Sequence, residues 1–372
     1  MKTKLSLYIH IPFCIRKCRY CDFLSGPADE LTQKKYIDCL TTEIRSNASK
    51  YKEAEVVTVY FGGGTPSILP GRDITELLNT IRECMNVVPE AEITIEINPG
   101  TVDPAKLTAY KAAGINRLSI GLQSARDDEL NLLGRIHSRK DFDEVYRWAR
   151  EAGFGNISVD LMSAIPGQNL EAYKENLDYV ISIKPEHISS YSFQLEEGTW
   201  FYDHKDEYEW PSEELDRAIY ELTGDVLEAS GYNRYEISNY ALNGYESRHN
   251  GVYWKRGNYL GLGLGAASLI DNVRYRNTDN MSDYLSGTSV VERETLDRQA
   301  QMEEFMFLGL RLMRGINPEE FRREFGVDIY ETYGDTIHKL ANEGLLICDS
   351  NIHLSKRGID ISNYVLAQFL MD

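Results

Sequence analysis

The sequence predicts an α/β fold, an incomplete (β/α)6 barrel followed by a C-terminal helical, winged-helix-like domain. Six apolar, β-rich runs alternate with amphipathic segments between residues 5 and 195. This alternation is typical of a parallel sheet with right-handed crossovers. Because a complete eight-fold barrel takes about 250 residues, six units that end near residue 195 favour an incomplete barrel. A doubly wound open sheet is the alternative.

The predicted elements follow one another in regular order. The strands cover residues 5–11, 56–61, 92–97, 117–121, 156–162 and 187–193. Apolar residues recur at helical spacing over about 30–50, 72–85, 104–113, 139–152 and 170–183. Since parallel βα folds place their functional groups at the carboxyl ends of the strands, we expect a site at that edge of the sheet.

The pattern changes twice after residue 200. Residues 200–285 are rich in Tyr, Trp and Asn, and the run that contains Gly261, Gly263 and Gly265 is interpreted as a loop. From about residue 294 the sequence predicts helices over 297–313, 330–343 and 356–370, and another that Asn317 caps and Pro318 opens. Short strands are expected over 344–348 and 352–354. We therefore predict three parts: a barrel (1–200), its extension (201–290) and a winged-helix-like domain (291–372).

Charge and hydropathy narrow the class of partner. The formal net charge is −18, which argues against nucleic acid because proteins that bind it carry a basic surface. No apolar run approaches the ~20 residues that span a bilayer, and the first residues do not resemble a signal peptide. We expect a cytoplasmic protein, and peripheral attachment at the inner membrane face and a homodimer both stay open.

Three cysteines, Cys14, Cys18 and Cys21, follow the first strand with the spacing Cys-x3-Cys-x2-Cys. Four thiolates normally hold a [4Fe–4S] cluster, so three leave one iron open to a small molecule. A structural zinc site would need a second Cys/His pair, and a disulfide framework would need a denser set of cysteines. The remaining cysteines, at 39, 84 and 348, are expected to be small buried residues.

Polar and glycine-rich motifs end the other strands. They are 62–66 (Gly-Gly-Gly-Thr-Pro), 96–99 (Glu-Ile-Asn-Pro), 121–124 (Gly-Leu-Gln-Ser), Asp160 with 165–168 (Ile-Pro-Gly-Gln), and 191–194. The glycines allow close approach of a ligand to the backbone. Glu96 can bind an amine or ribose hydroxyls, Gln123 and Asp160 can bind a ribose, and Arg135 can bind a carboxylate. Each side chain also has an ordinary structural role, but their shared edge indicates one site for a ligand with an amino-acid end and a nucleoside end.

These motifs resemble those of the radical S-adenosylmethionine (SAM) superfamily, in the branch that contains oxygen-independent coproporphyrinogen III oxidase. The resemblance extends from residues 8–14 through 249–254 to 354–358. In that superfamily SAM chelates the open iron, and an electron from the cluster releases a 5′-deoxyadenosyl radical. The resemblance implies that Cys14, Cys18 and Cys21 hold the cluster. It also implies SAM contacts from Tyr8, Tyr20, Gly63, Gly64, Thr65, Glu96, Gln123, Arg135 and Asp160.

Two departures separate this chain from the oxidases. They carry a fourth cysteine two residues after the third, where this chain has Phe23, and a long segment precedes their first strand, where this chain has four residues. Both features are similar to the heme chaperone group (HemW) of the same branch, which binds heme and passes it to respiratory enzymes. The run from His249 to Trp254 resembles that group's His-Asn-x-x-Tyr-Trp motif. By this resemblance His249 is a candidate heme ligand, and Tyr253 and Trp254 can pack on the porphyrin. A packed corner of the core is the alternative.

Three functions follow from these observations. The first is a heme carrier with a [4Fe–4S] cluster and SAM, whose partners are heme-accepting respiratory proteins or a reductant protein. The second is a radical enzyme that acts on a tetrapyrrole, as a coproporphyrinogen III dehydrogenase, a heme-degrading enzyme or a methylase. Phe23 argues against coproporphyrinogen oxidation. The third, a SAM-binding regulator that touches nucleic acid, is disfavoured by the negative charge.

Overall fold

Six parallel βα units form the first half of the protein. The computed structural model describes residues 2–288 and 290–371. The strands are β1 (Lys4–Ile11), β2 (Glu55–Gly63), β3 (Asn86–Ile97), β4 (Arg117–Gln123), β5 (Ile157–Ser163) and β6 (His187–Ser192). Each pairs in parallel with the next. The six strands therefore confirm the prediction of a parallel sheet.

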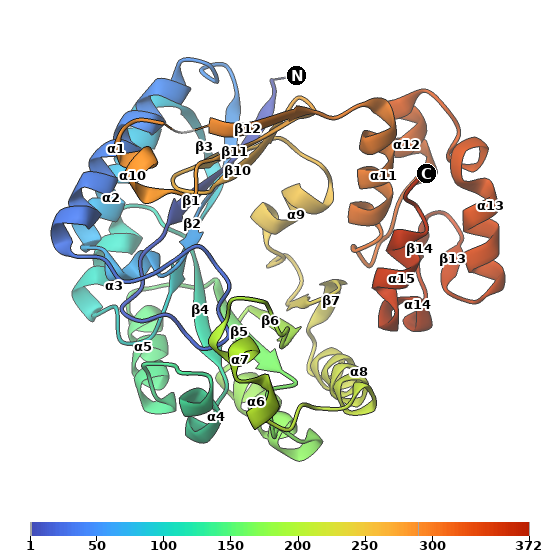
Figure 1. Cartoon of the computed structure of the whole chain (residues 1–372), viewed down its shortest axis with the longest axis horizontal. Helices are drawn as coiled ribbons and strands as arrows, with labels where there is room; N and C mark the ends of the chain where they lie inside the picture. The colour runs from blue at the N-terminus through green and yellow to red at the C-terminus, as the bar shows by residue number, and fades with distance from the viewer. Residues whose placement is uncertain (1, 289, 372) are drawn as a thin grey trace.

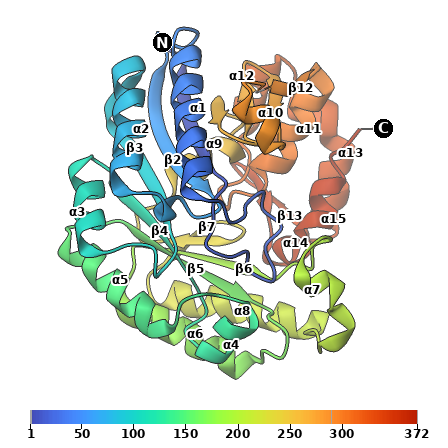
Figure 2. The same cartoon turned by 60° about the vertical axis from the view of Figure 1, so that its left-hand side comes forward.

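Helices cover the outer face of these strands (Figures 1 and 2). They are α1 (Glu30–Ala48), α2 (Gly71–Cys84), α3 (Pro104–Ala112), α5 (Arg139–Glu151) and α6 (Leu170–Ile183), together with two short elements, η1 (Pro66–Ile68) and α4 (Asp127–Leu132). Side-chain caps fix several helix starts: Asp29 accepts a hydrogen bond from the Thr32 amide, and Ser138 and Asp141 form a capping box. The five predicted helices are confirmed to within a few residues.

Alternation along the strands separates the core from the barrel interior. On β1 the side chains of Leu5, Leu7, Ile9 and Ile11 are fully buried in the layer beneath the helices. On β4 the intervening positions are Arg117, Ser119, Gly121 and Gln123, and these line an internal cavity. The interior of this barrel is therefore polar, and the apolar core lies outside it.

The segment after β6 adds strands to both ends of the sheet. It contains α7 (Trp200–Asp203), η2 (Lys205–Glu207), α8 (Glu213–Ala229), β7 (Asn233–Glu236), β8 (Asn239–Ala241), α9 (Arg248–Trp254), β9 (Tyr259–Leu262), β10 (Ala267–Ile270), β11 (Val273–Asn277), α10 (Met281–Leu285) and β12 (Val290–Thr295). The strand order is β12-β11-β10-β9-β1-β2-β3-β4-β5-β6-β8-β7. Because β12 and β7 do not pair with each other, the sheet stays open, which confirms the incomplete barrel.

The prediction of a loop around Gly261, Gly263 and Gly265 holds for only part of that run, because Gly261 lies in β9 and the other two glycines lie in the turn between β9 and β10. β9 pairs in parallel with β1 along its edge opposite β2, and β10 turns back antiparallel to β9. Glycine is required at Gly261 because a Cβ atom there would lie 2.2 Å from the Ala267 carbonyl oxygen. Gly261 therefore allows two backbone segments to approach each other closely within the sheet.

A second hydrophobic core organises the C-terminal part. Its elements are α11 (Arg298–Gly309), α12 (Pro318–Phe325), α13 (Ile329–Asn342), β13 (Leu346–Cys348), β14 (Ile352–Leu354), α14 (Lys356–Asp360) and α15 (Ser362–Ala367). Asn317 caps α12 as predicted. The single helix expected over 356–370 is instead divided at Ile361, whose backbone leaves the helical region. Cys348 is exposed, so its expected burial was wrong, and Cys39 and Cys84 are half-buried.

A buried ion-pair network joins this C-terminal part to the barrel extension. Arg256, which follows α9, donates from Nε to Glu304 Oε2 of α11 at 3.1 Å and from Nη1 to Glu324 Oε1 at 3.1 Å. Arg274 of β11 donates to the other oxygen of Glu304 at 2.5 Å. The side chain of Arg256 is 2% exposed and that of Glu304 is 7% exposed. Each of the two buried charges, Arg256 and Glu304, thus has two partners of opposite charge.

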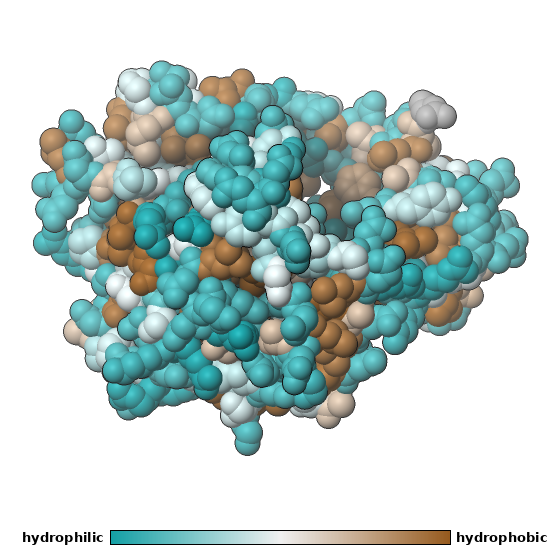
Figure 3. Space-filling model, turned by 60° about the horizontal axis from the view of Figure 1, so that its bottom comes forward, coloured by the Kyte–Doolittle hydropathy of each residue, from teal (hydrophilic) through white to brown (hydrophobic). Residues whose placement is uncertain are grey.

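The outer surface agrees with the acidic, polar composition. On the face shown in Figure 3, hydrophilic residues predominate and hydrophobic residues form separate patches. Among the described residues, no helix combines the length and the apolar character that crossing a bilayer requires.

Candidate functional site

One large cavity lies at the carboxyl ends of the barrel strands. Its volume is about 520 Å³, within the range of small-molecule and cofactor sites. The lining includes all three clustered cysteines, and of the nine residues that the sequence assigned to SAM it includes eight: Tyr20, Gly63, Gly64, Thr65, Glu96, Gln123, Arg135 and Asp160. The ninth, Tyr8, is outside this lining; its hydroxyl lies 3.1 Å from His10 Nδ1.

The cysteines lie on a loop, residues 12–26, that closes on itself. The Cys14 amide donates to the Gly26 carbonyl at 3.0 Å, and the Gly26 amide donates to the Pro12 carbonyl at 3.0 Å. The far side of the loop is held by Arg19, whose amide donates to the Leu133 carbonyl and whose guanidinium stacks on Trp200. We call residues 12–26 the cysteine loop. Its anchors hold all three thiols at the mouth of the cavity.

The glycine-rich turn packs directly against the cysteine loop. The Gly64 amide donates to the Ile11 carbonyl at 2.9 Å and the Thr65 amide to the Phe13 carbonyl at 2.7 Å. A Cβ atom on Gly64 would lie 2.7 Å from the Phe13 oxygen and 3.0 Å from Cys14 Sγ. A side chain there would therefore displace the loop that carries the thiols.

Polar groups face two of the cysteine sulfurs. Thr65 Oγ1 lies 3.4 Å from Cys14 Sγ, and Arg135 Nη1 lies 3.6 Å from Cys18 Sγ. Arg135 also donates to the Tyr20 hydroxyl, to Asn98 Oδ1 at 2.6 Å and to the Gly121 carbonyl at 2.9 Å. Arg135 is therefore directed into the site and is not a surface residue at a helix end.

Glu96 lies at the centre of the cavity wall. Its Oε1 accepts from the Tyr60 hydroxyl at 2.8 Å and its Oε2 accepts from the Gly63 amide at 3.1 Å. Burial raises the pKa of this carboxyl to about 7; the Tyr60 hydrogen bond opposes the rise and the nearby Asp160 adds to it. A carboxyl with this pKa gains most from a cationic ligand, because the cation stabilises its charged form.

Gln123 adopts an unusual backbone conformation. Its φ is 68°, the left-handed region that non-glycine residues rarely occupy, and the β4–β5 register shifts between Gly121 and Gln123. The side-chain oxygen accepts from the Tyr191 hydroxyl at 2.8 Å. Strain of this kind persists where the surroundings hold a side chain in place for function.

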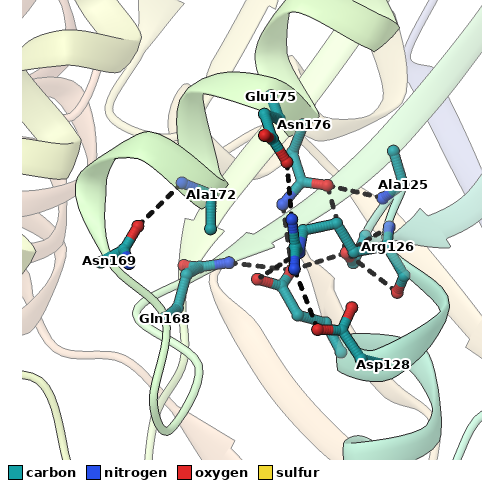
Figure 4. Close-up of polar contacts among 10 residues, drawn as sticks. Ala125, Arg126, Asp128, Gln168, Asn169, Ala172, Glu175 and Asn176 are labelled. Carbon is teal, nitrogen blue, oxygen red and sulfur yellow. Dashed lines mark hydrogen bonds and ion pairs between the residues drawn. The ribbon is translucent and has the colours of Figure 1, made fainter.

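Behind this strained residue, polar contacts that involve Ala125, Gln168 and Asn176 hold the loop that follows β4 (Figure 4). Glu129 accepts from the Ser124 hydroxyl at 2.6 Å, from Asn176 at 3.0 Å and from Gln168 at 3.1 Å. The Ala125 amide in turn donates to Asn176 Oδ1 at 2.7 Å. Gln168, which sequence reasoning placed among the ligand-binding motifs, therefore supports the cavity wall from outside.

Comparisons with known proteins agree with this geometry. Residues 8–180 match the radical SAM superfamily and residues 296–361 match the HemN C-terminal domain. The chain is 36% identical to the heme chaperone HemW of Lactococcus lactis, covering 99% of this chain and 97% of that protein. The HemW proteins of Bacillus subtilis and Escherichia coli are 35% and 32% identical, and each comparison covers at least 98% of both chains. This chain belongs to the HemW family of radical SAM proteins.

A solved structure shows the same fold. The radical SAM enzyme coproporphyrinogen III oxidase (HemN) from Escherichia coli superposes with a TM-score of 0.88 at 23% identity, covering 100% of this chain and 91% of that one. At this identity the likeness establishes the fold of the HemW family member and not its reaction. Membership of the radical SAM superfamily implies a [4Fe–4S] cluster and SAM as its cofactors.

The residues around the cysteines fit such a cluster. Three thiols are soft ligands for iron, and the Arg135 and Thr65 groups beside them are donors of the kind that tune cluster sulfurs. Among the described residues, no group of three or more His, Cys, Asp or Glu side chains could hold one metal ion. The cysteines of a cluster bind different irons, so this finding argues against a single-ion site and is compatible with a cluster.

The 249–254 motif of this HemW family member lies on α9, where the His249 ring stacks on Tyr60 of the cavity wall with ring centroids 4.9 Å apart. His249 is 1% exposed; its Nδ1 lies 2.7 Å from Thr58 Oγ1 and its Nε2 lies 2.9 Å from the Tyr253 hydroxyl. Burial lowers the pKa of this imidazole to about 3. Both ring nitrogens are therefore engaged within the protein, as expected of a packed core corner. Iron ligation through Nε2 would require the contact with Tyr253 to break.

Trp254 points away from the barrel interior. Arg311 of the C-terminal part stacks on its ring at 4.5 Å, and its Nε1 is buried without a hydrogen-bond partner among the described residues. Of the motif, it is Asn250 that lines the large cavity. The three candidate heme residues, His249, Tyr253 and Trp254, thus all lie on α9. Their neighbour on the same helix, Asn250, is the one that faces the site.

Arg117 and Tyr60 are among the residues of the cavity wall that sequence reasoning missed. Arg117 opens a run, Arg117-x-Ser119-x-Gly121-x-Gln123, in which every second residue is polar or glycine. Read with a period of two, this run would have placed Arg117 inside the barrel. Tyr60 gave no such signal, because an aromatic residue in a strand is ordinarily part of the apolar core.

Proposed function

We propose that this protein is a heme chaperone that binds heme and delivers it to heme-dependent proteins, among them respiratory proteins. The proposal is carried by 32–36% identity, over nearly the full length of both chains, to proteins named heme chaperone HemW. Phe23, where the related oxidases have cysteine, supports it. A cytoplasmic location and a reductant protein as a second partner belong to the same proposal.

The cavity residues supply the setting for the two cofactors. Cys14, Cys18 and Cys21 would hold the cluster, with Arg135 and Thr65 beside the sulfurs. Glu96 is placed to bind an amine, and Gln123 and Asp160 to bind hydroxyls. When bound, the cluster and SAM supply one-electron chemistry. The protein's part is to orient them and to exclude water from the barrel interior.

Hemin titration of the cluster-loaded protein tests the proposal. We expect a stoichiometric Soret band that persists on gel filtration, and transfer of the heme to an apo-hemoprotein. Equal binding by an unrelated acidic protein of similar size would contradict specific binding. A cluster-free sample, with Cys14, Cys18 and Cys21 replaced by Ala, shows whether the cluster is needed.

The heme ligand can be separated from a packing residue with two variants. If His249 Nε2 binds iron, Tyr253→Phe frees that nitrogen and tightens hemin binding, whereas His249→Ala abolishes the Soret band. If His249 only positions α9, both variants lower the melting temperature and the Soret band keeps its position. Tyr364→Phe, the same change at an exposed tyrosine of α15, is the matched control and should bind hemin as wild type.

A second candidate function is a radical SAM enzyme that acts on a tetrapyrrole. The observation in its favour is the completeness of the cavity, which gathers all three cysteines and eight predicted SAM residues. Anaerobic incubation of reduced protein with SAM and either coproporphyrinogen III or heme tests it. A modified tetrapyrrole would favour the enzyme, whereas 5′-deoxyadenosine alone would not.

A further inference from the structure

The floor of the cavity contains a buried cation without a protein partner. Arg117 is the first residue of β4 and is 2% exposed. Its Nε is buried without a hydrogen-bond partner, and no ion pair joins its guanidinium to a carboxylate within residues 2–288 and 290–371. The side chain lines the cavity. Burial of an unpaired guanidinium is costly, so the arrangement points to an anion that arrives with a ligand.

The nearby acids are engaged elsewhere. Glu96 accepts from Tyr60 and Gly63, and Asp160 accepts from the hydroxyls of Ser119 and Ser158 at 3.2 to 3.3 Å. The charge of Arg117 opposes the rise that burial causes in the pKa of both carboxyls. Neither carboxylate forms an ion pair with it. Arg117 is therefore not simply the counter-ion of one of them, and its donors remain directed at the cavity.

Neutral amides complete the floor. Asn250 of α9 and Asn239 of β8 line the same cavity. The side-chain amide of Asn250 forms no hydrogen bond with the described part of the chain, whereas Asn239 donates to the buried Glu236. A guanidinium and an adjacent free amide offer donors that suit a carboxylate. The thiols are at the opposite end of the cavity, on the cysteine loop.

We propose that Arg117, assisted by Asn250, binds a carboxylate of the ligand that occupies the floor of the barrel. The proposal deepens the proposed function: if the cargo or substrate is a tetrapyrrole, the carboxylate is one of its propionates. SAM is the competing source, because its methionine end also carries a carboxylate; but that end chelates the open iron, and the thiols that hold the iron lie at the opposite end of the cavity, which favours the tetrapyrrole. The function of Arg117 is the same in both cases, and the source is settled by experiment.

Hemin and its dimethyl ester distinguish the first source, because the ester lacks the negative charges and keeps the macrocycle. We expect wild-type protein to bind hemin about 10- to 100-fold more tightly than the ester, the range for loss of a charged hydrogen bond. Arg117→Met should remove most of this preference, and Arg117→Lys should retain part of it. Arg147→Met, which changes an exposed arginine on α5, is the matched control and should bind as wild type.

Equilibrium dialysis with SAM distinguishes the second source. If the affinity for SAM falls in Arg117→Met while the hemin preference is unchanged, the carboxylate belongs to SAM. The proposal is overturned if a folded Arg117→Met protein keeps both the hemin preference and the SAM affinity. If Arg117→Met does not fold, Arg117→Lys and Asn250→Ala are measured, and wild-type affinities in both would equally overturn it.

Failure of the proposed function gives a different result. Wild-type protein that binds neither hemin nor its ester would refute the heme chaperone, while the SAM measurement would still decide the role of Arg117. The converse result is that wild-type protein binds hemin tightly with no preference over the ester, while Arg117→Met keeps the wild-type affinity for SAM. This result would leave the chaperone function in place and refute the carboxylate site.

Discussion

Replacement of Glu96 by Gln should change the way stability depends on pH. The carboxyl has a pKa of about 7 in the folded protein, against an ordinary value of 4.5. Below pH 4.5 the group is protonated in both states and contributes nothing. Between pH 4.5 and 7 the unfolded chain loses this proton and the folded protein keeps it, so stability falls as pH rises. Above pH 7 the carboxyl is ionised in both states, and the loss of stability has reached its full value.

The size of the effect follows from the two pKa values. Their difference corresponds to roughly 3 kcal/mol, and this is an upper limit because the carboxyl faces an open cavity. Glutamine can keep both contacts: its oxygen can accept from the Gly63 amide, and the Tyr60 hydroxyl can rotate to accept from the new amide. At pH 8 we therefore expect Glu96→Gln to be about 1–3 kcal/mol more stable than wild type, and at pH 4.5 nearly equal to it.

Urea denaturation of the cluster-free protein at pH 4.5, 6 and 8 measures this directly. Glu83→Gln, at the exposed end of α2, is the control and should follow wild type at every pH. A constant difference between Glu96→Gln and wild type across this range would refute the raised pKa. If Glu96 also binds the amine of SAM, the variant should gain stability and lose affinity for SAM together.

Three further predictions concern the loop, the domain junction and the buried imidazole. Gly64→Ala should lower the iron content of reconstituted protein, since the new Cβ would approach Cys14 Sγ to 3.0 Å, whereas Gly155→Ala, which meets nothing within 4 Å, should load normally. Arg256→Met should destabilise the protein in urea by about 1–3 kcal/mol, because the buried Glu304 loses one of its two arginine partners and keeps Arg274. Arg276→Met, at an exposed pair, should cost less than about 1 kcal/mol. Burial lowers the pKa of His249 to about 3, so its contribution to stability is present above pH 6.5 and is lost as pH falls toward 3. His249→Asn should therefore lose less stability than wild type between pH 7 and 4.5, and parallel losses would contradict this.

The sequence predicted those parts of the fold in which the local pattern of residues is compatible with only one kind of element, a strand or a helix. The six strands and five helices of the barrel have clear periods. Four of these helices begin at a side-chain cap (Asp29, Asp103, Ser138 or Asn169), whereas α2 follows Pro70 without one. β9 was not predicted because its partner, β1, lies far away in the sequence. Pairing decides whether a short glycine-containing run becomes a strand. The last helix is interrupted at Ile361, and an isoleucine in the sequence does not indicate a break in a helix.

The site was predicted to a similar extent and for a similar reason. Motifs at strand ends converge on one edge whatever the details of packing, so the three cysteines and eight of the nine residues expected to contact SAM do line one cavity. Side-chain contacts could not be predicted from the sequence: Tyr8 stacks on Tyr60 and stays outside the cavity lining, and within one short helix His249 stacks on Tyr60 while Asn250 lines the cavity. Only the tertiary structure separates two adjacent residues in this way.

The position of β1 between β2 and β9 has a consequence for synthesis of the chain. The cysteine loop emerges early from the ribosome, but 247 residues separate Ile11, at the end of β1, from Tyr259, at the start of β9. At about 5–20 residues per second, one edge of β1 stays without its partner for roughly 12 to 50 s. During that interval the strand that supports the cysteines is paired on one side at most. Stable incorporation of iron is therefore expected to follow the completion of β9, late in translation or after release.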